Sequence, residues 1–289
     1  SIIIPLYNKA DYIAETLKSV LNQTYCDYEV IVVNDSSTDN SLEVASSFQD
    51  ERIHIYTKEN EGVSAARNYG IMHAKYDYIA FLDADDIWES DYLECQKKLI
   101  EIYPDAGIYS TAFYSLEKGK RKLRNVLINE HIHFLVHDYF KESVMNGLSI
   151  CWTSSLCLKK EVIKEIPMFR VGIKRGEDLD LWLRIALNYD VAYLNLPKVF
   201  YRTGLSDSLT SDYSKNGEFP YYEWFNFTSE SSYYRKYVIL VVYIHAKNAF
   251  IHHDYDTCLA ELWSVKTIAW RFKWAERLLL LVISWIKSK

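Results

Sequence analysis

The chain has 289 residues, 49% of them hydrophobic and 15% aromatic, which is enough for one large α/β domain with an extension or for two domains. Its net charge of −6 argues against a nucleic-acid partner, because nucleic-acid binding needs a basic surface. The five cysteines are odd in number and show no CxxC spacing, so we expect a reducing compartment and neither a disulfide framework nor a structural zinc site.

The first hundred residues alternate short apolar runs with amphipathic segments. Strands are expected over residues 2–5, 29–33, 53–56 and 78–82, and no charged n-region precedes the first run, so we interpret it as a strand and not a signal peptide. Helices are expected from a cap at Asp11 to Leu21 and over residues 41–48 and 61–74. This order predicts right-handed crossovers and a parallel sheet.

The second part of the chain is less regular. We expect helices over residues 91–103, 137–146 and from 177 onward, and strands over 106–114, 150–158, 191–194 and 199–201. Residues 118–124 hold five Lys and Arg around one Gly, typical of a solvated hairpin tip or of a contact with an anionic acceptor or membrane surface. Polar residues 203–219 indicate a boundary, and long aromatic helices are expected beyond it.

The C-terminal stretch from Trp270 to Lys289 mixes Arg and Lys with Trp and Phe and then runs from 278 to 286 without a charge. This run is too short to span a bilayer, and no other run is long enough. The stretch can form a peripheral membrane contact, or it can be a helix packed against its neighbours.

Three carboxylates, Asp83, Asp85 and Asp86, follow the apolar strand 78–82. The carboxyl ends of parallel strands are where open α/β sheets bind ligands. Acids at i and i+2 of an extended segment point the same way, and a cation with a preference for hard oxygen ligands, Mg²⁺ or Mn²⁺, would relieve their repulsion. The alternative is a solvated acidic turn that caps the next helix.

Other expected strands and helices also begin or end with polar residues. Asp35 can accept the imide N–H of a pyrimidine base, or it can cap a helix. Arg67 can present its guanidinium to a base carbonyl or a phosphate, or it can lie on the surface. Asp83 can bind ribose hydroxyls while Asp85 holds a metal that bridges two phosphates. Dinucleotide-binding, P-loop and calcium-loop motifs are absent from the sequence.

Together these motifs resemble glycosyltransferase family 2 enzymes with the GT-A fold. The resemblance is carried by SIIIPLYN (1–8), VNDSSTD (33–39), EGVSAARN (61–68) and FLDADD (81–86), and GED (176–178) with LWLR (181–184) resembles the acceptor-side motif. The resemblance implies roles for eleven residues. The nucleotide-sugar would be bound by Pro5, Tyr7, Asn8, Asp35, Arg67, Asp83, Ala84 and Asp85. The metal would be bound by Asp85 and Asp83. Asp178 would be the general base, and Glu177 and Trp182 would lie on the acceptor side. Asp86 is expected to support or cap the motif.

The implied fold is Rossmann-like, with a mainly parallel central sheet flanked by helices. A GT-A domain over residues 1–205 would divide into a nucleotide-binding half (1–110) and an acceptor half (111–205), followed by a helical extension over 206–289. The implied activity is metal-dependent, inverting transfer of a hexosyl or N-acetylhexosaminyl group from a UDP-sugar to a hydroxyl of a saccharide or lipid-linked saccharide. The implied setting is bacterial cell-surface polysaccharide assembly, in the cytoplasm or at the inner face of the membrane.

Two other functions are possible for a chain with acids at a strand end: a nucleotidyltransferase and a non-catalytic binding subunit. A sugar-phosphate nucleotidyltransferase normally has a Gly-rich basic loop after its first strand, whereas residues 5–10 hold one Lys and no Gly. A non-catalytic nucleotide-sugar-binding subunit that keeps the fold is argued against by the intact Asp35, Asp85 and Asp178. Many family members place a His after a Tyr-Arg pair, but none follows Tyr201-Arg202 closely, which leaves Asp207 or water to complete the metal's ligands.

Overall fold

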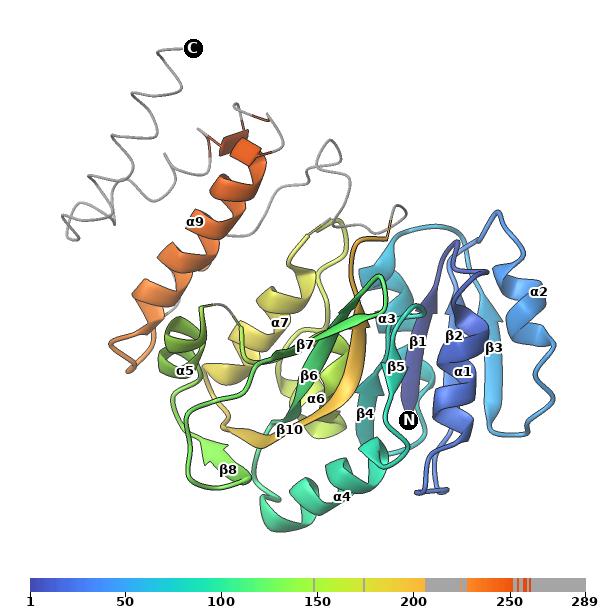
Figure 1. Ribbon diagram of the computed structural model, residues 1–289, viewed down its shortest axis with the longest axis horizontal. Coiled ribbons are helices and arrows are strands. Elements are labelled where there is room, and N and C mark those ends of the chain that lie inside the picture. The colour runs from blue at the N-terminus through green and yellow to red at the C-terminus, as the bar shows by residue number, and fades with distance from the viewer. Residues whose placement is uncertain are drawn as a thin grey trace.

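The computed structural model describes residues 1–147, 149–173, 175–205, 224, 228–251, 254, 257, 258 and 260 (Figure 1). A single sheet runs through the middle of the molecule with helices on both faces. Its path is β3-β2-β1-β4-β9-β6-β10-β5, with β7 paired to β6 and β8 paired to β10.

The first four strands are parallel, as the alternating pattern predicted. They are β1 (Ile2–Leu6), β2 (Val30–Asn34), β3 (Ile53–Thr57) and β4 (Tyr78–Phe81). The sheet then becomes mixed, because β9 (Leu156–Lys159) lies antiparallel between β4 and β6 (Ile108–Glu117). The α/β class with a central sheet flanked by helices is therefore confirmed, and the sheet is parallel over its first four strands and mixed beyond them.

Both faces of the sheet are buried, which explains why its early strands are apolar without alternation. Side chains alternate between faces along a strand. Ile2 and Ile4 belong to one hydrophobic cluster, whereas Ile3 belongs to the other. The helices that cover the two faces complete the two clusters.

The helices match most of the expected segments. They are α1 (Ile13–Leu21), α2 (Ser41–Ser46), α3 (Val63–His73), α4 (Tyr92–Ile102), α5 (Tyr139–Asn146), α6 (Lys160–Glu165), α7 (Glu177–Ala186) and α9 (Tyr234–Ile251). The predicted cap at Asp11 is wrong, because α1 begins after Tyr12 without a capping side chain. The sequence analysis missed α6 and the short strands β5 (Ile87–Trp88) and β8 (His133–Val136).

Two other segments differ from expectation, and a third agrees with it. Residues 150–158 form a 3₁₀ turn, Thr153–Ser155, before β9 and not one strand. The two predicted strands after residue 190 are one strand, β10 (Val191–Arg202), with register shifts on either side of Pro197, whose missing N–H weakens the ladder. The basic stretch forms the expected exposed hairpin, in which β7 (Lys120–Arg124) pairs antiparallel with β6.

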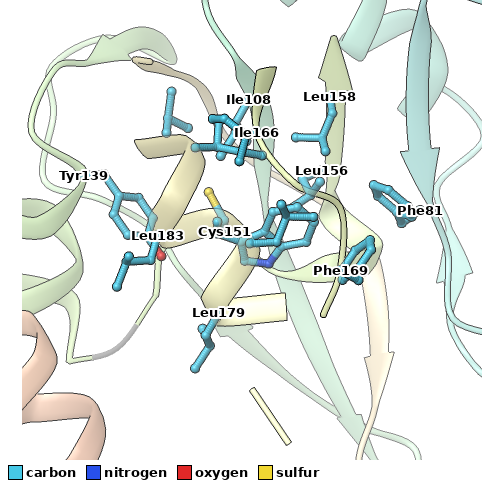
Figure 2. Packing of buried hydrophobic residues seen from close by; sticks show 14 of the residues in the cluster. Phe81, Ile108, Tyr139, Cys151, Leu156, Leu158, Ile166, Phe169, Leu179 and Leu183 are labelled. Atoms are coloured by element: carbon cyan, nitrogen blue, oxygen red, sulfur yellow. The ribbon is translucent and has the colours of Figure 1, made fainter. Parts of the chain in front are cut away.

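The helix α9 packs against α5. Tyr234 and Tyr237 of α9 contact Phe140 of α5, with ring centroids 4.8 and 5.6 Å away. Tyr139, beside Phe140, belongs to the same hydrophobic cluster as Leu183 of α7, and both are labelled in Figure 2. In the described ranges no helix is long and apolar enough to cross a membrane, and the stretch from Trp270 to Lys289, like residues 206–219 of the expected boundary, lies outside them.

Candidate active site at the carboxyl edge of the sheet

The ends of β1, β2 and β4 come together at one edge because these strands are parallel. The loops after β1 and β2 are joined by Asn8, whose side-chain oxygen accepts a hydrogen bond from the backbone N–H of Thr38 at 2.8 Å. Asn8 adopts a left-handed backbone conformation with φ 50°, which Asn tolerates. Pro5 is half-buried in β1, and Tyr7 is 45% exposed beside it.

Asp35, just after β2, is buried and accepts three hydrogen bonds. Oδ1 accepts from Lys58 Nζ at 2.9 Å and from the N–H of Glu61 at 3.1 Å, and Oδ2 accepts from the N–H of Gly62 at 2.8 Å. These bonds tie the end of β2 to the loop just before α3. Neither α2 nor α3 has a side-chain cap, so Asp35 does not act as a helix cap. Because an ionised carboxylate offers about four lone-pair positions, these bonds leave Oδ2 room for one more donor.

Arg67 bridges two carboxylates from opposite ends of the site. Its Nη2 donates to Asp83 Oδ1 and its Nη1 to Glu177 Oε1, both at 2.8 Å, and its guanidinium lies over the ring of Phe169. Arg67 is only 3% exposed, which excludes the surface interpretation. Its Nε is buried and has no hydrogen-bond partner among the described residues.

The three acids after β4 are in different environments. Asp86 is fully buried; its carboxylate accepts from Ser154 Oγ at 2.6 Å and from the N–H of Arg202 at 3.0 Å. Burial, and then the charges of Asp85 and Asp83, raise the pKa of Asp86 well above its usual value. Asp86 therefore holds the loop in place, while Asp83 and Asp85 remain partly accessible.

Two basic side chains, Lys9 and Arg202, lie next to the three acids, and neither was predicted from the sequence. Lys9 Nζ lies 3.0 Å from Asp85 Oδ2, and Arg202 donates from Nη1 to the backbone oxygen of Asp85 at 2.6 Å. Lys9 directly follows the PLYN motif and could have been noticed. Arg202 could not, because 117 positions separate it from Asp85 and only the sheet brings them together.

The donor set at Asp83 and Asp85 fits a divalent metal. Burial, followed by the charge of Asp83, raises the pKa of Asp85 against the opposing effect of Lys9, so an added cation would be favourable there. Mg²⁺ often binds one or two carboxylates and takes its other ligands from substrate phosphates and water. The described residues contain no group of three or more His, Cys, Asp and Glu side chains that could hold a metal, and Asp207 lies outside them.

The N-terminus of α7 carries the predicted general base. Asp178 Oδ2 accepts from Thr153 Oγ1 at 3.0 Å, and Oδ1 accepts from the N–H of Leu179 at 2.7 Å. Burial raises the pKa of Asp178, and Arg67 and these two hydrogen bonds oppose the rise. Burial and the charge of Asp178 raise the pKa of Glu177 to about 7, against the opposing effect of Arg67. Thr153 was missed, because nothing in the sequence links it to residue 178.

Trp182, expected on the acceptor side, lies in the core. It is fully buried between Phe81 and Phe169, with ring centroids 6.0 and 5.7 Å away. Figure 2 shows Phe81 and Phe169 side by side in this cluster. The side chain of Trp182 therefore packs between α7 and the sheet and is not exposed to an acceptor. Its expected position came from the motif alone, which does not show that this face of α7 packs inward.

Comparison with known proteins identifies relatives of this chain. The family profile described as glycosyl transferase family 2 matches residues 1–166. The putative teichuronic acid biosynthesis glycosyltransferase TuaG of Bacillus subtilis is 33% identical over 67% of this chain and 74% of its own length. An uncharacterized glycosyltransferase of Rickettsia felis is 36% identical over 64% of this chain, which spans only 30% of that protein.

A solved structure shares the architecture. TarS residues 1–349 of S. aureus, in complex with UDP-GlcNAc, superimposes with a TM-score of 0.72 over 90% of this chain and 78% of that chain, at 18% identity. At that identity the likeness shows the fold, which is GT-A. The family profile covers more than half of the sequence, and therefore the chain belongs to glycosyl transferase family 2.

Proposed function

We propose that this chain transfers a sugar from a UDP-sugar to a hydroxyl of a saccharide or lipid-linked saccharide. The observation that carries the proposal is the pair of hydrogen bonds from Arg67 to Asp83 and Glu177. This bridge joins the acidic motif at the end of β4 to the start of α7, where Asp178 lies. Groups suited to a nucleotide diphosphate and a group suited to deprotonating a hydroxyl therefore belong to one site.

The donor end of the site would use the loops after β1, β2 and β4. Asp35 Oδ2 retains capacity to accept the imide N–H of uracil, and the partly accessible Asp83 would accept hydrogen bonds from ribose hydroxyls. Pro5, Tyr7, Asn8 and Ala84 would shape the walls around the nucleotide. The complex of TarS with UDP-GlcNAc, a protein of the same fold, supports this choice of donor.

The reaction would proceed by direct displacement. Asp178 accepts the proton of the acceptor hydroxyl as its oxygen forms a bond to the anomeric carbon, and the bond from that carbon to the diphosphate oxygen breaks. One base and one displacement invert the anomeric configuration. A divalent metal on Asp83 and Asp85 would offset the charge that develops on the diphosphate. Lys9, beside Asp85, supplies a further positive charge at the same place.

Relatives support polysaccharide assembly as the setting, since TuaG is named for teichuronic acid biosynthesis and another relative, of Pasteurella multocida, is named chondroitin synthase. Family membership favours sugar transfer over the nucleotidyltransferase alternative. The intact acids favour catalysis over a binding-only role.

Donor binding followed by turnover tests the proposal. Thermal-shift screening of nucleotide-sugars with Mn²⁺ should show one UDP-sugar that raises the melting temperature, because a ligand that binds only the native state stabilises it. UDP release from that donor should then follow, and NMR of the product should show an inverted anomeric centre. Retention would overturn the displacement mechanism. Pyrophosphate release from UTP and a sugar phosphate would instead support the nucleotidyltransferase.

A further inference from the structure

The β6–β7 hairpin and the loop after it form an unusual surface on this acidic protein. We call residues 118–132 the hairpin surface. It carries five basic side chains and one acidic one, although the whole chain has a net charge of −6. All of β7 is exposed, and the basic residues are Lys118, Lys120, Arg121, Lys122 and Arg124.

The same surface exposes large apolar side chains. Ile128 is 95% exposed and Ile132 is 59% exposed, with Leu123 at 48% and Val126 at 43%. Exposed apolar residues scattered singly are ordinary, whereas these four lie within ten residues of the chain, next to the five basic side chains in the sequence.

The loop that presents these residues is held firmly. Leu127 is buried, and its backbone N–H and carbonyl are both bonded to the side chain of Asn195, at 2.8 and 2.9 Å. The N–H of Asn195 donates to the carbonyl of Ile132 at 2.7 Å. The fold therefore fixes both ends of the segment that carries Ile128, and the side chain is displayed by a built loop.

Two simpler explanations account for only part of the composition of the hairpin surface. Lysines on an exposed strand such as β7 discourage edge-to-edge aggregation, but that role has no use for an exposed Ile128. An anionic saccharide would pair with the basic side chains, but it would gain nothing from Ile128 and Ile132. A surface of anionic lipid headgroups over hydrocarbon uses both.

We propose that the hairpin surface binds an anionic lipid bilayer, with the basic side chains among the headgroups and Ile128 and Ile132 at the acyl boundary. Two of the basic residues also contact the protein: Arg121 lies over the ring of Phe200 at 4.5 Å, and Arg124 Nε donates to Ser115 Oγ at 3.2 Å. The three lysines would therefore dominate the electrostatic attraction.

The hairpin also lies close to the candidate active site. Leu116, next to the hairpin turn, pairs with Arg202 of β10, and Arg202 donates its N–H to Asp86. In Figure 1 β7 lies beside the ends of β6 and β10, and its chain continues to β8. A bilayer bound here would bring the sheet edge close to the membrane, as a lipid-linked acceptor requires; this consequence rests on the proposed function, whereas the binding itself does not.

Vesicle co-sedimentation of the full chain tests the proposal without donor or acceptor. The protein should sediment with vesicles of equimolar phosphatidylcholine and phosphatidylglycerol, and not with phosphatidylcholine alone, and added NaCl should release it. The triple variant Lys118→Gln, Lys120→Gln, Lys122→Gln should bind roughly 100-fold more weakly, because each Lys near an anionic surface contributes about fivefold. Ile128→Ser should weaken binding about tenfold and leave its salt dependence in place.

A matched control separates local from overall charge. Lys18, Lys98 and Lys164 are exposed lysines on α1, α4 and α6, and their triple change to Gln alters the net charge equally. This control should bind vesicles nearly as well as the unaltered chain. Equal losses in both triple variants, or no binding by the unaltered chain, would overturn the proposal. So would a hairpin variant that keeps vesicle binding but loses affinity for a soluble anionic saccharide. None of these results bears on sugar transfer, which UDP release measures separately.

Discussion

Arg67 and Glu177 lie 110 positions apart in the chain, yet Arg67 Nη1 donates to Glu177 Oε1 at 2.8 Å in the buried interior. The same guanidinium holds Asp83. Burying charged groups is costly unless they are paired, so this bridge is stable only when both halves of the domain are in place. The bridge thus couples the geometry of the donor end to that of the base.

Arg67→Lys should break this coupling. Lys has a single ammonium group and cannot donate along two fixed directions, so one buried carboxylate loses its partner. We expect the free energy of unfolding to fall by about 1–3 kcal/mol and the kcat for transfer to fall as well, as measured by chemical denaturation and UDP release.

Arg52 offers a matched control. Its Nε and Nη2 donate to Asp50, on a partly exposed pair in the loop before β3. Arg52→Lys should change the free energy of unfolding by less than about 1 kcal/mol and leave turnover unchanged. If both variants behaved alike, the importance of the Arg67 bridge would be refuted.

Asp178→Asn should separate the fold from the chemistry. Asn can still accept hydrogen bonds at its side-chain oxygen, so the start of α7 should persist and the melting temperature should change little. It cannot take a proton from the acceptor, and we expect kcat to fall by about 10²–10⁴-fold. Asp190→Asn, at a partly exposed acid that pairs with the exposed His137, serves as the control with normal turnover. A fully active Asp178→Asn protein would exclude Asp178 as the base.

Thr153 should tune the pH dependence of the reaction. Asp178 must be ionised to accept a proton, so the rate should fall as the pH falls through its raised pKa. The hydroxyl of Thr153 favours the ionised form. Thr153→Val should therefore raise the pKa of Asp178 further and shift the acid limb of the kcat profile to higher pH.

Thr153→Ser keeps the hydroxyl and should keep the original pH profile. A loss of activity in Thr153→Val without a shifted profile would indicate that Thr153 has only a structural role.

Asp180 should stabilise the fold and should not contact the acceptor. It is fully buried, and its carboxylate accepts from Arg184 Nε at 2.9 Å and from Trp224 Nε1 at 2.8 Å, while Arg170 Nε lies 3.3 Å away. Asp180→Ala should lower the free energy of unfolding by about 3–5 kcal/mol, because it leaves a buried guanidinium uncompensated. Asp190→Ala should cost less than about 1 kcal/mol, and a similar cost for both would contradict this account.

Much of the fold could be predicted because the first half of the chain follows local rules. The apolar runs that became β1 to β4 and the amphipathic segments between them depend on neighbouring residues alone. The 3₁₀ turn at Thr153–Ser155 and the continuous β10 could not be predicted in the same way. Their form depends on which strands they meet, and β9 takes its place only after β4 and β6 are in the sheet.

The family, the fold class and the candidate acids at the sheet edge could all be predicted from the sequence, because motifs of adjacent residues carry that information. The tertiary structure alone decided how those acids differ. It buried Asp86 against Arg202, placed Lys9 on Asp85, and brought Thr153 to Asp178 and Arg67 to Glu177. Trp182, which was expected to contact the acceptor, is buried in the core. The physical reason is that burial and charge pairing are set by residues far apart in the chain, which meet only when the sheet and its helices have assembled.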